Sequence, residues 1–114
     1  MEIKNARIEN VTVGLDDRNR LSAKITFEGN QGQSSWCHFV LTKTVEAQHL
    51  RKLMLYTGAY KIDDLNGKIV RKVEHEHCLC GFGDPIEDKF IWLEDEELKE
   101  LTESQIVELL SKIK

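Results

Sequence analysis

Residues 21–27, Leu-Ser-Ala-Lys-Ile-Thr-Phe, decide the fold class, because apolar and polar side chains alternate along them without interruption. A period of two is typical of a β-strand with one buried face and one face in water. Residues 3–13 and 36–41 are also rich in strand-forming residues, and a short polar loop joins each of them to this strand. The first third of the chain is therefore expected to be a meander of three antiparallel strands. The row expected to be buried is Leu21, Ala23, Ile25 and Phe27.

Two stretches have a helical pattern. In residues 45–57 apolar side chains recur on one helical stripe, Thr44 precedes them as a candidate N-cap, and Gly58 follows where helices often end. Residues 102–105, Thr-Glu-Ser-Gln, form a capping box, and the apolar residues after them repeat at helical spacing. We therefore expect a central amphipathic helix and an acidic helical segment at about 94–114.

The region between these helices is expected to add strands. Residues 68–80 favour one long strand, the glycine-rich residues 81–85 break it, and residues 90–93 form a short strand. Since no repeat, low-complexity tract or linker interrupts the sequence, we expect a single domain over residues 1–114. The predicted fold class is α+β: a twisted, mostly antiparallel sheet of about five strands with the helices packed on one face.

Size and composition limit the function classes. The 114 residues suffice for one domain, and 16 basic against 20 acidic side chains give a net charge of −4, which argues against a free-standing binder of duplex DNA. The sequence has no run of about 18 apolar residues and no signal-peptide pattern, so we expect a cytoplasmic protein without membrane contact. Three cysteines, an odd number, are a poor disulfide framework and agree with that compartment.

The charge is unevenly distributed along the chain. Residues 1–83 carry 12 basic and 10 acidic side chains, whereas residues 84–114 carry 4 basic and 10 acidic ones. One interpretation is a solvated helix surface, which is the usual reason for such charge. The other is an acidic docking surface for a basic surface of a partner protein, with aromatic side chains just before the acidic run as anchors. The residues of this candidate surface are Phe90, Trp92, Glu94, Asp95, Glu96 and Glu97.

Residues 75–80, His-Glu-His-Cys-Leu-Cys, contain four side chains of the types that bind zinc. On a strand, however, the two histidines point to one face and the two cysteines to the other, so the four cannot surround one ion. We therefore expect the cysteines to pack as small apolar residues and the protein to need no metal or other cofactor. The alternative metal site joins His75 and His77 to His38 from a neighbouring strand.

The sequence contains no enzyme signature. Cys37 and His38 are a thiol and a base, but adjacent residues on a strand point in opposite directions and cannot act on each other. Residues 81–83, Gly-Phe-Gly, lack the third glycine and the helix of a dinucleotide site, so these glycines are expected to form a turn. We therefore expect a protein that is not an enzyme.

One basic cluster offers an alternative function. Lys68, Arg71 and Lys72 lie close together on the strand expected at 68–80, and aromatic side chains such as Trp36 are available for base stacking. A small β-domain that binds single-stranded nucleic acid or a nucleotide through these three residues is therefore the alternative to protein binding. The acidic composition disfavours it.

Six stretches over about three-quarters of the chain form a recognisable pattern: residues 3–8, 14–17, 21–29, 63–68, 71–73 and 81–90. Taken together and in order, they resemble a family of small uncharacterised bacteriophage and prophage proteins. The chain departs from the family pattern at residues 35–39, where the family has a glycine-rich aromatic stretch, and at Ile62 and Phe90, near which the family has tryptophans. The acidic C-terminal segment has no counterpart in that pattern.

The resemblance implies a phage accessory protein that acts by binding, and it carries over no catalytic residues. By analogy with anti-CRISPR proteins, it implies an inhibitor of a host defence component, working in the cytoplasm of the host cell. The acidic residues 94–97 would then face a basic surface of the host protein.

Overall fold

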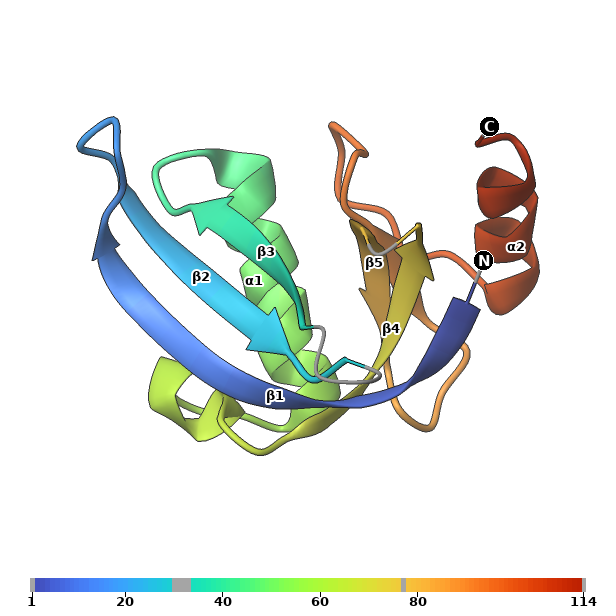
Figure 1. The fold of residues 1–114 in the computed structure, drawn as a ribbon. Helices are drawn as coiled ribbons and strands as arrows, with labels where there is room; N and C mark the ends of the chain where they lie inside the picture. The colour runs from blue at the N-terminus through green and yellow to red at the C-terminus, as the bar shows by residue number, and fades with distance from the viewer. Residues whose placement is uncertain (1, 30–33, 77, 114) are drawn as a thin grey trace.

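The computed structural model describes residues 2–29, 34–76 and 78–113. In these residues the chain forms a curled antiparallel sheet of six strands with two α-helices, an α+β fold as the sequence predicts (Figure 1). The strands lie in the order β3-β2-β1-β4-β5-β6. Their bounds are β1 Glu2–Leu15, β2 Leu21–Phe27, β3 Ser35–Val40, β4 Ile69–His75, β5 Cys78–Gly83 and β6 Phe90–Trp92; the helices are α1 Thr44–Thr57 and α2 Glu103–Ser111, and a 3-10 turn, η2, covers Ile62–Leu65.

The long strand β1 belongs to both halves of the sheet. Its first half, Glu2–Arg7, pairs with β4, and its second half, Ile8–Leu15, pairs with β2. The register with β2 shifts between Ile8 and Asn10, which is the irregularity that lets a strand bend. Figure 1 shows β1 curving along the base of the sheet, with β2 and β3 on one side of it and β4 and β5 on the other.

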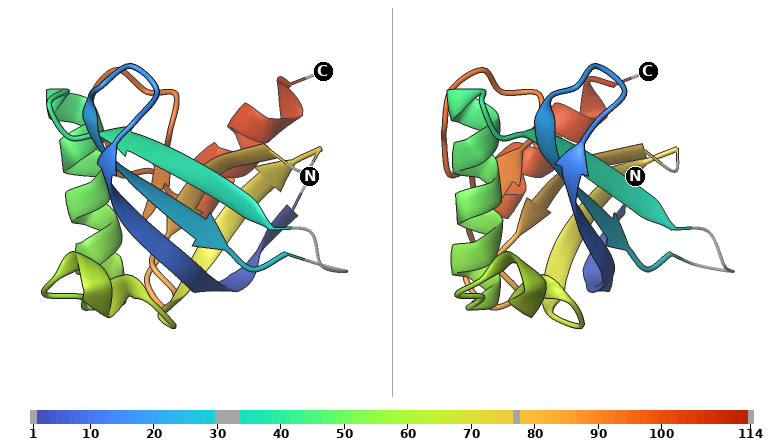
Figure 2. Two further views of the ribbon diagram at one scale, coloured as in Figure 1. Left: turned by 60° about the vertical axis from the view of Figure 1, so that its left-hand side comes forward. Right: turned by 90° about the vertical axis from the view of Figure 1, so that its left-hand side faces the viewer.

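The two helices cover opposite faces of the sheet, so the expectation that both pack on one face is wrong. Leu53 of α1 belongs to the main core on the concave face, together with Phe82 and Ile91. Ile106 of α2 packs instead against Phe90 and its neighbours in a second cluster. Figure 2 shows the two helices apart from each other, with strands of the sheet between them. Successive residues of a strand point to opposite faces, so β6 is buried on both sides. The three-residue strand Phe90–Trp92 therefore joins two cores.

The expected buried row of β2 is confirmed at three of its four positions. Ala23, Ile25 and Phe27 are fully buried, whereas Leu21 is 46% exposed. Leu21 pairs with Leu15 at the outer end of the β1–β2 ladder, and Leu15 is itself exposed, so the core does not extend to this end of the strand.

The central helix is present as predicted apart from its cap, whereas the helical segment expected at about 94–114 is helical only over α2, Glu103–Ser111. This helix begins at the capping box of Thr102, because residues 94–101 before it form turns and irregular structure. The N-cap of α1 is Lys43, and Thr44 is its first residue instead of its cap. Gly58 ends α1 in the left-handed conformation, with φ 76°, as predicted. The capping box of Thr102 and Gln105 is also present at the start of α2.

The strand expected at 68–80 is a hairpin of two strands, which is why the sheet has six strands. β4 ends at His75, Glu76 has a positive φ of 50°, and β5 begins at Cys78. The glycines expected to form a turn lie inside β5 instead. A Cβ on Gly81 would be 2.4 Å from the Ile91 carbonyl oxygen, and one on Gly83 would be 2.3 Å from a side-chain atom of β6. These positions lack side chains because β6 lies close against β5.

Candidate functional site

A groove of about 700 Å³ lies along β3. We call it the β3 groove. It is bounded by β3, by the first two turns of α1, by one residue of β5 and by residues 93–96 after β6. It combines apolar side chains with three carboxylates. The described residues that line it are Trp36, Cys37, His38, Phe39, Lys43, Thr44, Val45, Glu46, His49, Leu79, Leu93, Asp95 and Glu96.

One edge of β3 pairs with β2, and the backbone groups of the other edge point away from β2. In the described part of the chain, β2 is the one strand neighbour of β3. The Leu41 N–H donates to β2 at 2.9 Å, whereas the N–H of the preceding residue, Val40, donates to the Glu46 carboxylate at 2.9 Å. N–H groups alternate between the two sides of an antiparallel strand. Those of Trp36 and His38 therefore point the same way as that of Val40, away from β2.

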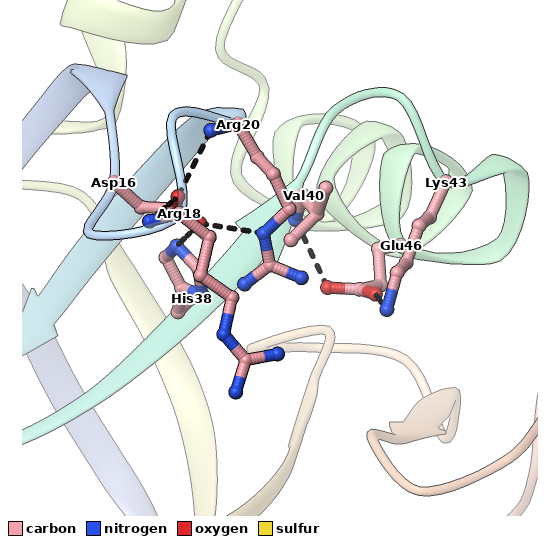
Figure 3. Close-up of polar contacts among 7 residues, drawn as sticks. All are labelled: Asp16, Arg18, Arg20, His38, Val40, Lys43 and Glu46. Atoms are coloured by element: carbon pink, nitrogen blue, oxygen red, sulfur yellow. Dashed lines mark hydrogen bonds and ion pairs between the residues drawn. The ribbon is translucent and has the colours of Figure 1, made fainter.

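Glu46, in the first turn of α1, occupies one end of this edge (Figure 3). Its Oε1 accepts the Val40 N–H, and its Oε2 lies 3.6 Å from the Lys43 ammonium. A carboxylate is favoured there because the N-terminus of a helix carries a partial positive charge. The edge of β3 is thus capped at Val40, whereas the N–H groups of Trp36 and His38 have no hydrogen-bond partner among the described residues and leave the edge open there.

The opposite wall of the groove is the acidic turn, residues 94–97. The turn begins where the Asp95 N–H donates to the Trp92 carbonyl oxygen at 3.2 Å. Beyond the turn, Glu100 accepts the Tyr56 hydroxyl at 2.7 Å, which ties the segment to α1. This hydrogen bond is the main reason why the pKa of Glu100 lies below its usual value, although partial burial acts in the other direction. The acidic turn is therefore held at both ends.

Two buried titratable groups lie in the walls of the groove. His49 is 1% exposed, and its Nε2 has no hydrogen-bond partner among the described residues. Burial lowers the pKa of this imidazole, although the charges of Asp95 and Glu46 act in the opposite direction. Burial raises the pKa of the Cys37 thiol. Both groups are thus uncharged at neutral pH, and the carboxylates determine the sign of the groove's charge.

The chain was compared with protein-family models, curated proteins and solved structures. None of them matches it. The resemblance to the phage protein family therefore stays a prediction. Among the described residues, neither helix has the length and apolar character needed to cross a membrane.

The aromatic residues expected to anchor a partner lie in the core. Phe90 is fully buried and Trp92 is 6% exposed, because α2 covers the face of β6 that both rings occupy. Neither ring is available to a partner while α2 is in place. The acidic residues after them lie at the surface, and Asp95 and Glu96 line the groove. The exposed aromatic side chain beside the groove is Trp36, which is 56% exposed.

Lys72, one of the three residues proposed to bind nucleic acid, is an interior residue. It is 1% exposed, although a charged strand residue would ordinarily face water. Its ammonium donates to the Glu28 carbonyl oxygen at 2.7 Å and pairs with the Glu74 carboxylate at 2.9 Å. Lys72 therefore connects β4 to the end of β2, and it has no exposed surface that a nucleic acid could contact.

Arg71 is likewise held by the protein itself. Its guanidinium donates to the carbonyl oxygens of Asp84 and Glu87, and it lies 4.5 Å from the centre of the Phe90 ring. Lys68 is half-buried just before β4. The basic cluster thus fixes the β5–β6 loop and the sheet, and it does not form a shared basic face.

The histidines of the alternative metal site lie in different parts of the sheet. His38 is on β3 and His75 ends β4, and β2 and β1 lie between these two strands. Residue 77 is outside the described residues. Among the described residues, no three His, Cys, Asp or Glu side chains are grouped so that they could hold a metal ion.

His38 faces a carboxylate that the β1–β2 turn already uses (Figure 3). Its Nε2 lies 3.5 Å from Asp16 Oδ2. Asp16 accepts the N–H groups of Arg20 and Arg18 and the Nε–H of Arg20, each at 2.9 Å. The hydrogen bonds, with that of the Arg20 N–H the largest cause, hold the pKa of Asp16 below its usual value, although burial opposes them. Asp16 is therefore an ionised structural residue of the turn.

The sequence predicts one wall of the groove but not the other. Asp95 and Glu96 belong to the expected partner surface, whereas the β3 edge and His49 do not. The order of elements does contain a signal for that edge. Residues 36–41 are the last strand of a meander and are followed directly by a helix, which places this strand at the border of a sheet.

Proposed function

We propose that this protein is a binding module without catalytic activity that holds a basic segment of a partner protein in the β3 groove. The observation that carries the proposal is a single groove in which half-buried apolar side chains, such as Leu79 and Leu93, lie close to the carboxylates of Asp95 and Glu96. Apolar contact supplies binding free energy, and complementary charge selects the partner and speeds its association.

The fixed charges of the groove favour a cation over an anion. Of the described residues that line it, Lys43 is the one ammonium, and it lies 3.6 Å from the Glu46 carboxylate. For Asp95 and Glu96, no basic partner is found in the described part of the chain, and Glu94 and Glu97 add to the charge beside them. A Lys or Arg of a partner would therefore form ion pairs here without displacing an existing one.

Inhibition of a host defence protein is the specific form of this proposal that the resemblance to phage proteins implies. Proteins that handle nucleic acids present basic surfaces to the phosphate backbone. An acidic module that covers such a surface would compete with the nucleic acid for it. The resemblance and the acidic charge of the groove support this role, and partner binding as such does not depend on it.

Selection from a displayed library of random peptides tests the proposal. With peptides of about 12 residues, we expect the protein to enrich sequences in which Lys or Arg stands beside apolar residues. A variant with Glu94, Asp95, Glu96 and Glu97 changed to Ser should fold normally but bind the selected peptide more slowly. Its association rate should also depend less on salt between about 50 and 300 mM, because screening acts on the charges that it lacks.

The matched control removes the same number of charges away from the groove. Its association rate and salt dependence should stay within about twofold of those of the unchanged protein. Equal association rates of the two variants across this salt range would contradict the proposal, and so would a library that enriches no basic peptide. The four exposed residues changed to Ser in the control are Asp63, Glu87, Glu103 and Glu108.

A further inference from the structure

The open edge of β3 indicates how a partner segment is held, an inference that rests on the proposed function. We propose that the segment binds as an added β-strand, pairing with the backbone groups of Trp36 and His38. Edge strands present unpaired N–H and C=O groups that a second chain can pair with. Main-chain hydrogen bonds then supply affinity, and the alternating side chains supply specificity.

The pairing stretch of β3 is short and ends at a defined point. Each residue has one donor and one acceptor, so Trp36 and His38 offer up to four backbone hydrogen bonds. The next N–H on this side, that of Val40, already donates to Glu46 at 2.9 Å. A ladder of this length is too short to give high affinity by itself. Each hydrogen bond to the partner replaces hydrogen bonds to water, so its net contribution to the binding free energy is small. Side chains of the segment must therefore contribute.

The two faces of an added strand would meet different surroundings. Side chains alternate across a strand, so one set enters the groove, where Leu79 and Leu93 are apolar and Asp95 and Glu96 are acidic. The other set lies on the outer face beside Trp36, whose ring already has the Lys24 ammonium 4.7 Å from its centre. The fitting partner is therefore an extended segment with apolar residues at alternate positions and with Lys or Arg among the side chains that enter the groove.

A second copy of this chain is the other candidate that could pair with the edge of β3. β3 has the sequence Ser-Trp-Cys-His-Phe-Val and contains no Lys or Arg. A pair of β3 strands would therefore bring no basic side chain of β3 to Asp95 and Glu96. Charge complementarity favours a basic segment of another protein.

N-methylation of the selected peptide, one backbone nitrogen at a time, tests strand addition. The methyl group removes an N–H donor and blocks close approach, so it acts only where the N–H faces β3. Affinity should fall by at least about tenfold at the two alternate positions of the bound segment whose N–H groups pair with the carbonyl oxygens of Trp36 and His38. At the positions between them, it should change by less than about twofold.

Two substitutions of His38 form a matched pair on the protein. His38→Ala and His38→Pro both remove the imidazole, but only proline also removes the N–H that faces the groove. Edge strands tolerate proline at such a position. We expect His38→Pro to bind the peptide about tenfold more weakly than His38→Ala. The Tm of both variants is measured first, and if the proline variant unfolds, the N-methyl scan decides.

The possible outcomes separate the two proposals. Peptide binding without a period of two in the scan, for example with losses at every third or fourth position, would overturn strand addition and leave the proposed function standing. If no peptide binds, the proposed function fails and strand addition fails with it. A dimer in solution that His38→Pro separates into monomers and His38→Ala does not would overturn the choice of a foreign segment as the occupant.

Discussion

Replacing Gly81 with alanine tests the close approach of β5 and β6. The new Cβ would lie 2.4 Å from the Ile91 carbonyl oxygen, where ordinary contact between non-bonded heavy atoms needs about 3.5 Å. The obstructing atom belongs to the backbone and cannot turn aside as a side chain can. To relieve the contact, β6 must therefore move away from β5 by about 1 Å.

The expected loss of unfolding free energy follows from the contacts that β6 makes with β5 and with both cores. The shift would lengthen ladder hydrogen bonds such as that from the Leu93 N–H to the Cys80 carbonyl oxygen, now 2.9 Å, and each such bond contributes about 1 kcal/mol. It would also disturb both cores, because Phe90 and Ile91 point into different ones. Overpacking of this kind costs about 1–3 kcal/mol, so we expect Gly81→Ala to lose about 2–4 kcal/mol of unfolding free energy in total.

Urea unfolding followed by tryptophan fluorescence measures this loss against a matched control. Gly14 lies in β1 with no atom within 4 Å of an added Cβ. Gly14→Ala should therefore change the unfolding free energy by no more than about 0.5 kcal/mol, or raise it slightly. If Gly81→Ala unfolds at the same urea concentration as Gly14→Ala, with the same slope, the strands are not in the close contact described here.

Three further predictions address the core and the groove. Ile25→Asp places an unpaired charge at a fully buried position and should cost about 3–5 kcal/mol in urea unfolding; an unchanged midpoint would place residue 25 outside the core. Because burial lowers the pKa of His49, the unfolded chain binds its proton more readily. The contribution of neutral His49 to stability should therefore be complete above about pH 6.5 and decrease as the pH falls below it. Thermal unfolding between about pH 5.5 and 7.5 should accordingly show a weaker pH dependence for His49→Phe, and an identical dependence would contradict this. Finally, a thiol reagent with detection by mass spectrometry should label the exposed Cys78 in the folded protein and the buried Cys37 only after unfolding; equal rates would show that Cys37 is accessible.

The strands of the N-terminal meander could be predicted because local pattern and tertiary burial agree there. In β2, apolar and polar side chains alternate as the buried and more exposed positions do from Ala23 to Phe27, whereas the order is reversed at Leu21 and Ser22. The β4–β5 hairpin could not be predicted, because it turns at Glu76 in a positive φ without the glycine, asparagine or proline that normally marks such a turn. Residues 68–80 therefore have the pattern of one continuous strand.

The candidate site was only half predictable, because solvent exposure depends on distant parts of the chain. The acidic run 94–97 is visible in the sequence and lies at the surface. In contrast, Trp92 is hidden by a helix that follows it in the sequence, and Lys72 is buried against Glu28, far from it along the chain. No local pattern distinguishes an exposed aromatic or basic strand residue from one that another element covers.

During synthesis, the first half of β1 has to wait for its partner strand. Residues 8–15 can pair with residues 21–27 almost as soon as both are made, whereas residues 2–7 pair with residues 69–74. A ribosome that adds about 5–20 residues per second needs about 2–10 s to make the chain between residues 27 and 74. During that interval β3 can join the β1–β2 hairpin, but residues 2–7 extend from it without a partner strand and are open to chaperones or to the same segment of a neighbouring nascent chain. Conditions that slow translation between β3 and β4 should therefore increase aggregation more than an equal delay after β4.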